Sequence, residues 1–381
     1  MRVAFYAPLK PPDHAIPSGD RRVARLLLDA LYLAGCEPVV ASRLRSFDAA
    51  GLAPRQARIA AEGRAVAEEL IAQWRAEPDA SPRLWFTYHL HYKAPDWLGP
   101  AVAAALGIPY VVAEASYAGK RAGGPWDLGH RGVAAALRQA DRVIGLNSAD
   151  RAGVLPLLAH PDRFVAFPPF LDASRYRKPD RPPSPAGAEG RGWGLPGREP
   201  RLISVAMMRP GDKLASYRVL GAALVSLLDL PWSLEVIGDG PARGAVRDAL
   251  APLGARVDFA GALDESAIAE RLAGADLFVW PAINEAFGMA LLEAQATGLP
   301  VVAGASGGVG DIVADGVTGT LSPPGDAVAF ACAVRALLGD SARRAAFGAA
   351  GRDKVRCEHD LPAAAARLAA ILAPLTRARA A

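Results

Sequence analysis

Two glutamates stand out because their spacing suits an elongated polar ligand. Glu285 and Glu293 are separated by seven residues, and they follow an apolar run that ends at Trp280. With about 1.5 Å of rise per helical residue, their carboxylates lie at most about 12 Å apart, which is close to the span from the sugar to the ribose of a nucleotide sugar. The helix N-terminus predicted between them offers free N–H groups and a positive dipole end, which suit a diphosphate. The alternative interpretation is that one carboxylate caps a helix and the other is a solvated surface charge.

The residues around these glutamates resemble the donor-site signature of the retaining glycosyltransferases of family 4. The similarity runs from the strand ending at Trp280 through residues 285–289 to residues 298–302. It implies the two-domain GT-B fold, in which Glu285 meets hydroxyl groups of the transferred sugar and Glu293 holds the ribose. It also implies donor-binding roles for the loop residues Phe287, Gly288 and Met289.

Arg209 and Lys213 look like the basic pair that this family places at the donor diphosphate. A guanidinium binds phosphate oxygens in bidentate fashion and an ammonium acts as a point charge, so the pair can stabilise the departing nucleotide without a metal. The sequence contains no Asp-x-Asp triplet, which argues against the metal-dependent GT-A enzymes. We therefore expect no metal site, and no cofactor apart from the nucleotide sugar as donor substrate. The loop departs from the commoner family spacing, and a solvated loop is the alternative interpretation.

Four glycines are further candidates for donor binding. Gly238 and Gly240 form a turn after an apolar strand, but Arg243 stands where a dinucleotide-binding fingerprint needs its third glycine. We therefore interpret this turn as the strand–turn–helix element that lines the donor pocket in the resembled family. Gly261 lies in a segment similar to the one that meets the nucleobase through main-chain atoms. Gly19 is also a candidate, and it lies beside Ser18, just before the first predicted helix.

A histidine pair is the candidate on the acceptor side. His89 and His91 follow the strand predicted over residues 84–88, and His89 lies where the family often has a histidine. A core or capping histidine is the alternative. Many family members carry another histidine after the next strand, where this chain has Glu114 and Ser116 instead. Either one of these replaces the missing histidine, or His89 or His91 reaches the same space, or catalysis is altered.

The elements that must position these residues alternate between apolar strands and helices, which predicts parallel sheets covered by helices. In the first half we expect strands at residues 2–7, 38–41, 84–88, 110–113, 142–146 and 163–166, with helices at 20–34, capped by Ser18, and within 54–74. In the second half we expect strands at residues 201–206, 234–237, 257–259, 277–280 and 301–303. The fold class is therefore α/β, with two Rossmann-like parallel-sheet domains of the GT-B type facing a central cleft.

The predicted domain boundaries follow from a change in composition between the halves. Residues 1–177 form the acceptor-side domain, and the Pro- and Gly-rich residues 178–200 form a linker. Residues 201–360 form the donor nucleotide-sugar-binding domain. Residues 361–381 are predicted to form a C-terminal helix that, by the family resemblance, packs back on the first domain.

Composition narrows the class of protein further. Half of the 381 residues are hydrophobic (51%), which is enough for about two folded domains. The net charge of +4 is mild and mixes bases with acids, so we expect no nucleic-acid partner. The three cysteines are scattered, which is typical of reduced thiols in the cytoplasm. No signal peptide or membrane span is predicted.

One local concentration of positive charge departs from this even mixture. Arg21, Arg22 and Arg25 are close in sequence, and Arg43 and Arg45 follow the next predicted strand. A solvated helix face explains them. The alternative is a surface attracted to an acidic acceptor or to anionic lipid at the inner face of the membrane.

Together these features predict a retaining hexosyltransferase that uses a nucleotide diphosphate sugar, with UDP as the working nucleotide, and a hydroxyl acceptor. The acceptor is a glycan, a lipid-linked sugar or a small molecule, and polysaccharide biosynthesis is the expected setting. A GT-B-like epimerase or phosphorylase would share the fold, and a non-catalytic sugar-nucleotide-binding protein would account for the missing histidine. The residues leave open the nucleotide base, the sugar, the acceptor and the oligomeric state.

Overall fold

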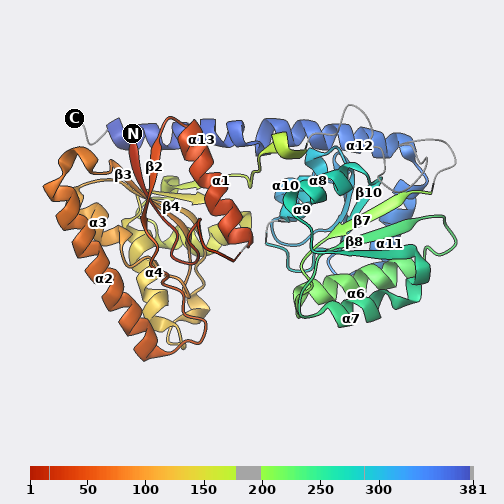
Figure 1. Cartoon of the computed structure of the whole chain (residues 1–381), viewed down its shortest axis with the longest axis horizontal. Helices are drawn as coiled ribbons and strands as arrows, with labels where there is room; N and C mark the ends of the chain where they lie inside the picture. Colours follow the sequence, from red (N-terminus) through yellow and green to blue (C-terminus); the bar gives the residue numbers. More distant parts are fainter. Residues whose placement is uncertain (17, 177–198, 287, 378–381) are drawn as a thin grey trace. The chain divides into compact units, whose positions relative to one another are not determined.

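The computed structural model describes residues 1–16, 18–176, 199–286 and 288–377, and the chain folds into two compact α/β units. Unit 1 contains Met1–Pro168 and the C-terminal segment that begins at Leu361, whereas unit 2 contains Pro169–Asp360. In each unit, helices lie on both faces of a β-sheet (Figure 1). The predicted α/β class with two parallel sheets is confirmed.

The sheet of unit 1 has six parallel strands in the order β2-β1-β3-β4-β5-β6. The strands are β1 (Arg2–Tyr6), β2 (Glu37–Ser42), β3 (Leu84–Leu90), β4 (Tyr110–Ala115), β5 (Arg142–Gly145) and β6 (Phe164–Ala166). The central strands β3 and β4 are almost continuously buried, as expected of a parallel sheet covered on both faces. Strand β3 continues two residues past its predicted end, so His89 lies within the strand rather than after it.

The helices of unit 1 begin where the sequence provides a suitable first turn. They are α1 (Gly19–Leu33), α2 (Ala53–Ala76), α3 (Gly99–Leu106), α4 (Asp127–Gln139), α5 (Arg151–Val154) and α13 (Leu361–Arg377). The predicted cap of α1 is confirmed, because the Ser18 hydroxyl accepts a hydrogen bond of 3.2 Å from the N–H of Arg21. Helix α13 packs against α1.

The sheet of unit 2 also has six parallel strands, in the order β12-β11-β10-β7-β8-β9. The strands are β7 (Arg201–Val205), β8 (Ser233–Ile237), β9 (Val257–Gly261), β10 (Leu277–Trp280), β11 (Val301–Gly304) and β12 (Gly319–Ser322). Strand β12 was not predicted. It begins with glycine, lies at the sheet edge and is only partly buried, so it lacks the apolar run that marks the other strands.

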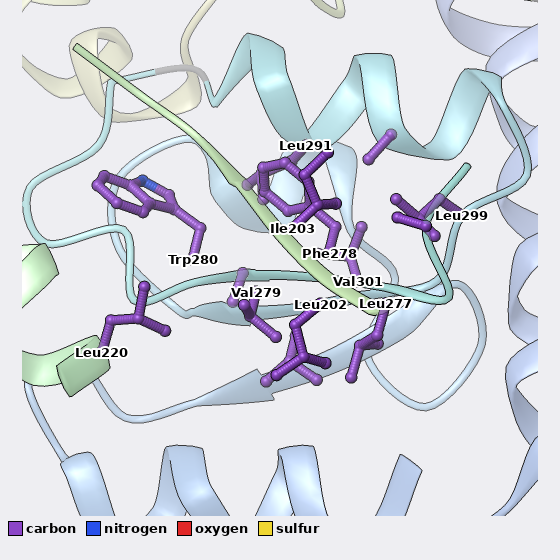
Figure 2. Close-up of a cluster of buried hydrophobic side chains, with 14 of the residues drawn as sticks. Leu202, Ile203, Leu220, Leu277, Phe278, Val279, Trp280, Leu291, Leu299 and Val301 are labelled. Atoms are coloured by element: carbon purple, nitrogen blue, oxygen red, sulfur yellow. The ribbon is translucent and has the colours of Figure 1, made fainter. Parts of the chain in front are cut away.

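The core of unit 2 forms where β7 and β10 meet the helices. Leu202, Phe278 and Val301 are fully buried on three neighbouring strands. Figure 2 shows their side chains gathered in one cluster, with Trp280 toward one end of it. The indole of Trp280 therefore belongs to the core, yet it stands at the carboxyl end of its strand.

The helices of unit 2 are α6 (Asp212–Val225), α7 (Arg243–Leu250), α8 (Glu265–Ala273), α9 (Met289–Ala296), α10 (Val309–Ile312), α11 (Ala327–Leu338), α12 (Ser341–Lys354) and a π-helical turn at Val355–His359. Three of them, α8, α11 and α12, are capped by aspartate, whereas the others have no side-chain cap among the described residues. The carboxylates of Asp264, Asp326 and Asp340 accept hydrogen bonds of 2.8–2.9 Å from main-chain N–H groups three residues on. Helix α9, which carries Glu293, instead has Gly288 as its N-cap.

The two ends of unit 2 are bonded to each other. The N–H of Leu171 donates to the carbonyl of His359 over 2.9 Å, and the N–H of Ala173 donates to the Asp360 carboxylate over 3.0 Å. The predicted division of the chain was different, because it placed a linker between two domains at residues 178–200. Residues 178–198 lie outside the described residues, and the structure divides the chain at Pro168 instead. The reason is that Leu171 and Tyr176 are buried in the core of unit 2.

Candidate functional site

The candidate donor residues of unit 2 lie at the point where its strand order reverses. Strands β7 and β10 are neighbours, and the chain runs outward from them in opposite directions across the sheet. In doubly wound parallel sheets, ligands bind outside the carboxyl ends of the strands at such a point. The loop after β7 carries Arg209 and leads to Lys213, and the loop after β10 carries Glu285.

Glu285 is held by two donors from different elements. Lys213, in the first turn of α6, donates to Oε2 of Glu285. The indole Nε1 of Trp280 donates to the same oxygen over 3.1 Å. The Lys213 ammonium also lies 5.4 Å from the centre of the Trp280 ring, within the range of a cation–π contact. Only 15% of the Glu285 side chain is exposed, so its carboxylate is both fixed and partly desolvated.

The loop between β10 and Glu285 has a strained backbone. Ala282 and Asn284 have φ angles of 53° and 50°, in the left-handed region that residues other than glycine rarely adopt. Such conformations cost on the order of 1–3 kcal/mol each and persist only where surrounding contacts impose them. Those contacts come from α6: the Ser216 hydroxyl accepts from the N–H of Ile283 over 3.0 Å, and Asp212 accepts from the Asn284 amide over 2.9 Å. Helix α6 thereby sets the position of Glu285.

Arg209 differs from Lys213 in having a free side chain. Its carbonyl accepts the N–H of Leu214 over 3.1 Å, which ties the loop to α6. Its guanidinium is exposed and makes no hydrogen bond or ion pair with any residue that the structure describes. Of the predicted basic pair, Lys213 is therefore already bonded to Glu285, whereas Arg209 keeps its full capacity to bind an anion.

The start of α9 carries the remaining predicted donor residues. Gly288 has a φ of 74° and precedes the helix, and Met289 is its first residue. Glu293 lies one helical turn further on and is only 4% exposed. Phe287 lies outside the described residues. The sequence therefore placed Glu285 on the loop and Glu293 on the helix correctly. Glu293 is buried, although a residue that binds a ligand at the surface would be expected to be exposed.

The glycine turn after β8 is explained by close contact with the loop after β7. A Cβ atom on Gly238 would lie 1.9 Å from the carbonyl oxygen of Ala206, and one on Gly240 would lie 2.4 Å from that of Met208. The main chain of the loop after β7 therefore occupies the space that side chains at Gly238 and Gly240 would need. Gly261, with a φ of 72°, is linked to the same turn because its carbonyl accepts the N–H of Gly238 over 2.8 Å. These glycines shape the loop that presents Arg209.

In unit 1, His89 also lies where the strand order reverses, at the carboxyl end of β3 next to β1. Its Nδ1 atom lies 3.0 Å from a carboxylate oxygen of Asp20, at the N-terminus of α1. Its Nε2 atom lies 3.8 Å from a carboxylate oxygen of Glu114, at the end of β4. Gly19, the first residue of α1, precedes Asp20 and is exposed, with open space where a side chain would be.

The charges around His89 favour its protonated form. Burial is the largest influence on this imidazole and opposes protonation, but Glu114 and Asp20 outweigh it and raise the pKa of His89 above its usual value. The hydrogen bond with His89 holds the pKa of Asp20 below its usual range. Burial raises the pKa of Glu114. The charge on each of the three side chains therefore affects the protonation of the other two.

His91 has a different environment and a different role. Its Nδ1 atom accepts hydrogen bonds of 3.1 Å from the N–H groups of Lys93 and Ala94, which closes the turn after β3. Burial is the main reason that its pKa falls to about 4, so the ring is neutral near pH 7. The capping alternative considered for the histidine pair thus describes His91 rather than His89.

Comparison with known proteins gives the family. The family model described as Glycosyl transferases group 1 matches residues 193–354. A D-inositol 3-phosphate glycosyltransferase from Frankia alni is 31% identical over 302 residues, which is 73% of this chain and 72% of that protein. The chain belongs to the group 1 glycosyltransferases.

Other curated members of the group 1 glycosyltransferases match over a shorter region. Proteins of the same name from Nocardia farcinica and Kineococcus radiotolerans are 36% and 32% identical over 56% and 55% of this chain. The matched part spans about half of their own length, 48% and 52%.

Solved structures support the GT-B fold expected of this group. The sucrose-phosphate synthase of Thermosynechococcus elongatus superposes with a TM-score of 0.70 at 23% identity, covering 99% of both chains. The Anabaena protein Alr3699/HepE in complex with UDP superposes with a TM-score of 0.71 at 15% identity, covering 98% of this chain and 100% of that one. At these identities the likeness concerns the fold.

The cluster of Asp20, His89 and Glu114 in unit 1 shows which residues lie where many group 1 glycosyltransferases were expected to have a histidine. Glu114 stands at the end of β4, where the resemblance called for a histidine, and the structure brings it to His89. The sequence left open whether Glu114 replaces this histidine or His89 reaches the same space. Both residues lie in one cluster, so these two alternatives are compatible. Ser116 lies just beyond it, where its side chain meets Asp150.

Several residues of these two clusters were missed by sequence reasoning. Trp280 was noted only as the end of a strand, although its indole bonds Glu285. Asp20 was noted only as the start of a helix, although it bonds His89. Their signal was present, because both are polar groups at the carboxyl edge of a predicted parallel sheet. Asp212 and Ser216 gave no such signal, since they act only through the loop that they hold.

The arginines considered for a membrane surface are mostly occupied by the loop before α1. Arg21 donates to the carbonyl of His14 over 2.8 Å, and Arg25 donates to that of Pro12 over 2.8 Å. Arg45 donates to the carbonyl of Leu9 over 3.0 Å, and Arg43 is paired with Asp13. Within the described part of the chain, no helix has the length and hydropathy needed to cross a bilayer.

Proposed function

We propose that this chain is a retaining glycosyltransferase that transfers a hexose from a nucleotide diphosphate sugar to a hydroxyl acceptor. The observation that carries the proposal is the Glu285 carboxylate, held between Lys213 and Trp280 at the carboxyl edge of β10. A fixed carboxylate on the loop after β10 and an exposed guanidinium, that of Arg209, on the loop after the neighbouring strand β7 suit a ligand with sugar hydroxyls at one end and phosphates next to them.

In the proposed reaction, each residue acts by binding or by charge. Glu285 accepts hydrogen bonds from hydroxyls of the transferred sugar, and Lys213 and Trp280 hold its carboxylate in place. Arg209 binds the diphosphate and stabilises the negative charge that grows as the nucleotide departs. Glu293 binds the ribose, and the N-terminus of α9 at Gly288 and Met289 faces the phosphates.

Retention of configuration follows in this proposal from attack on the same face of the sugar that the phosphate leaves. The bond between the anomeric carbon and the phosphate oxygen breaks, the acceptor oxygen bonds to that carbon, and the departing phosphate takes the acceptor's proton. Such a path needs positioning and electrostatic stabilisation rather than a protein base. It should also run without a metal, so activity should survive excess EDTA. Loss of activity with EDTA and its recovery with Mg²⁺ or Mn²⁺ would contradict this part of the proposal.

The acceptor class is proposed from the relatives. The Frankia alni protein is named for D-inositol 3-phosphate, a phosphorylated polyol, as its substrate. A polyol or sugar hydroxyl is therefore the acceptor we propose here, in polysaccharide or glycolipid synthesis. We also propose a cytoplasmic location with peripheral contact to the membrane, which co-sedimentation with anionic vesicles would test.

The donor is tested by thermal shift with UDP-, GDP- and ADP-sugars. A ligand that binds only the native state stabilises it by about 2.7 kcal/mol at 100 times its Kd, which is a readily measured shift. Release of free nucleotide is then measured with and without hydroxyl acceptors. Release that depends on an acceptor supports transfer. Conversion of the bound sugar without an acceptor would favour an epimerase, release that requires phosphate would favour a phosphorylase, and binding without turnover would favour a non-catalytic protein.

A further inference from the structure

His89 and Glu114 share an unusual backbone feature. In the register of β3 and β4, Tyr88 pairs with Ala113 and Leu90 pairs with Ala115, so His89 and Glu114 lie opposite each other between these pairs. Both have a positive φ, 63° and 59°, although neither is glycine. Two adjacent strands thus adopt the left-handed conformation at the same level, and the two side chains meet. Strain of this kind is concentrated at ligand sites, because ordinary packing does not require it.

The cluster also contains an unsatisfied acceptor. The Oε2 atom of Glu114 is buried and makes no hydrogen bond within the described residues, and 9% of this side chain is exposed. The Tyr88 side chain also interacts with this carboxylate. A buried carboxylate oxygen without a donor of its own is unfavourable, so a group that donates a hydrogen bond to Oε2 would be bound well there. Asp20, which is more than a third exposed, gives the cluster an opening to solvent.

The charge of the cluster limits what that group can be. The titratable groups facing His89 are Asp20 on α1, Glu114 on β4, Asp150 after β5, and Tyr88 and His91 on or beside β3. Even with His89 protonated, three carboxylates surround one cation, and His91 is neutral. A phosphate placed here would meet net negative charge, whereas a hydroxyl can donate to the carboxylates without cost in charge.

We propose that Asp20, His89 and Glu114 bind neighbouring hydroxyl groups of an uncharged polyol or of the polyol part of a larger acceptor. This inference rests on the proposed function, since it names the chemical group that the acceptor presents to unit 1. Glu114 accepts a hydrogen bond from one hydroxyl through Oε2, and Asp20 accepts from a second. His89 lies between the two carboxylates and keeps both of them in place through its Nδ1 and Nε2 atoms. Any phosphate carried by the acceptor lies outside this cluster.

The test is histidine NMR on the full chain labelled with ¹⁵N-histidine, with the His89 signals assigned by their loss in His89→Gln. The probes are glycerol, myo-inositol and D-glucose, and inorganic phosphate is the charged comparison. We expect at least one polyol to shift the His89 signals in a saturable way, and phosphate to leave them unchanged. Larger saturable shifts with phosphate than with any polyol would overturn the proposal in favour of an anion site. No saturable shift with any probe would overturn it outright.

Variants separate binding from general effects on the fold. Glu114→Gln should weaken the polyol response about tenfold or more, because a charge-assisted acceptor is lost. Glu68→Gln, on the exposed face of α2, is the matched control and should leave the response unchanged. If Glu114→Gln fails to fold, Asp20→Asn at the more exposed position replaces it, with the same expected loss. An unchanged polyol affinity in a folded variant would contradict the proposal.

The same samples separate this inference from the proposed function. Thermal shift with a UDP-sugar reports on nucleotide-sugar binding, which involves the candidate residues of unit 2. Nucleotide-sugar binding without any polyol response would overturn the polyol site and leave the transferase proposal standing. A polyol response without binding of any nucleotide sugar would support the site and overturn the transferase.

Discussion

The carbonyl oxygen of Ala206 occupies the space that a side chain at Gly238 would need. A Cβ atom there would lie 1.9 Å from that oxygen, far inside van der Waals contact, and the φ of Gly238 is 143°. The loops after β7 and β8 are therefore packed main chain against main chain. This contact positions Met207 and the residues that follow it, including Arg209.

Gly238→Ala should destabilise the protein by about 3 kcal/mol, because the added methyl forces the two loops apart. Gly244→Ala is the matched control. Gly244 lies in α7 with open space around it, so alanine there should be neutral or should stabilise by up to about 1 kcal/mol. Urea unfolding of both variants measures the difference. Equal midpoints for the two variants would show that the loop contact does not constrain the fold.

Arg209→Ala should lower turnover by on the order of a hundredfold or more, as the loss of one charge stabiliser in a desolvated site does. The fold should be unaffected, since the exposed guanidinium makes no hydrogen bond or ion pair with a described residue. Arg218→Ala, which removes another exposed arginine from α6, is the control and should retain full turnover. The measurement is kcat with a saturating nucleotide sugar. A rate near that of the native protein in Arg209→Ala would remove Arg209 from the proposed site.

Glu285 and Glu293 should respond differently to amide substitution. Glu293→Gln should weaken binding of the bare nucleotide diphosphate, because the proposed contact is to ribose. Glu285→Gln should leave that binding intact and lower transfer, because the proposed contact is to the sugar. Calorimetry with UDP and turnover assays give the two readouts. Equal nucleotide affinity in both variants would refute this division of roles.

The pKa of His89 should fall when Asp20 is replaced by asparagine, because a negative charge that favours the imidazolium is removed. Asp79→Asn, at an exposed position after α2, should leave that pKa unchanged. An NMR titration of the labelled histidines measures both. An unaltered His89 pKa in Asp20→Asn would show that the 3.0 Å contact does not persist in solution.

The same shift has a consequence for stability. Because the folded-state pKa of His89 is raised above its unfolded value of about 6.5, its contribution is fully present below about pH 6.5 and is lost as pH rises through the folded pKa. Asp20 acts in the opposite window, since its lowered pKa gives stability that is lost as pH falls through the folded value. Relative to His89→Gln, the native protein should therefore lose unfolding free energy as the pH is raised from about 6.5 through the folded-state pKa of His89.

Much of the architecture could be predicted because it depends on local patterns. Buried parallel strands are continuous apolar runs, and the first helix begins at a serine cap, so strands such as β10 and helix α1 were located to within about two residues. Strand β12 escaped because an edge strand that begins with glycine carries no such pattern. The position of Glu285 at the end of β10 was likewise recoverable from sequence.

The contacts of the site could not be predicted, because they join distant parts of the chain. Lys213 and Glu285 are 72 residues apart, and no periodicity links them. The left-handed conformations of His89 and Glu114 could not be predicted from sequence, since a positive φ is uncommon for any residue other than glycine. The role of Arg209 and Lys213 as a basic pair for the diphosphate stays a prediction, and only the structure shows that Lys213 is bonded to a carboxylate.

The hydrogen bonds from Leu171 to His359 and from Ala173 to Asp360 join the two ends of unit 2. Its sequence interrupts that of unit 1 once, between Pro168 and Leu361, and the residues just inside these two boundaries are held side by side. Segment Pro169–Asp360 could therefore be exchanged for that of another relative through two splices at one place in the fold, without cutting either sheet. Recombination could in this way combine one acceptor-side unit with different nucleotide-binding units.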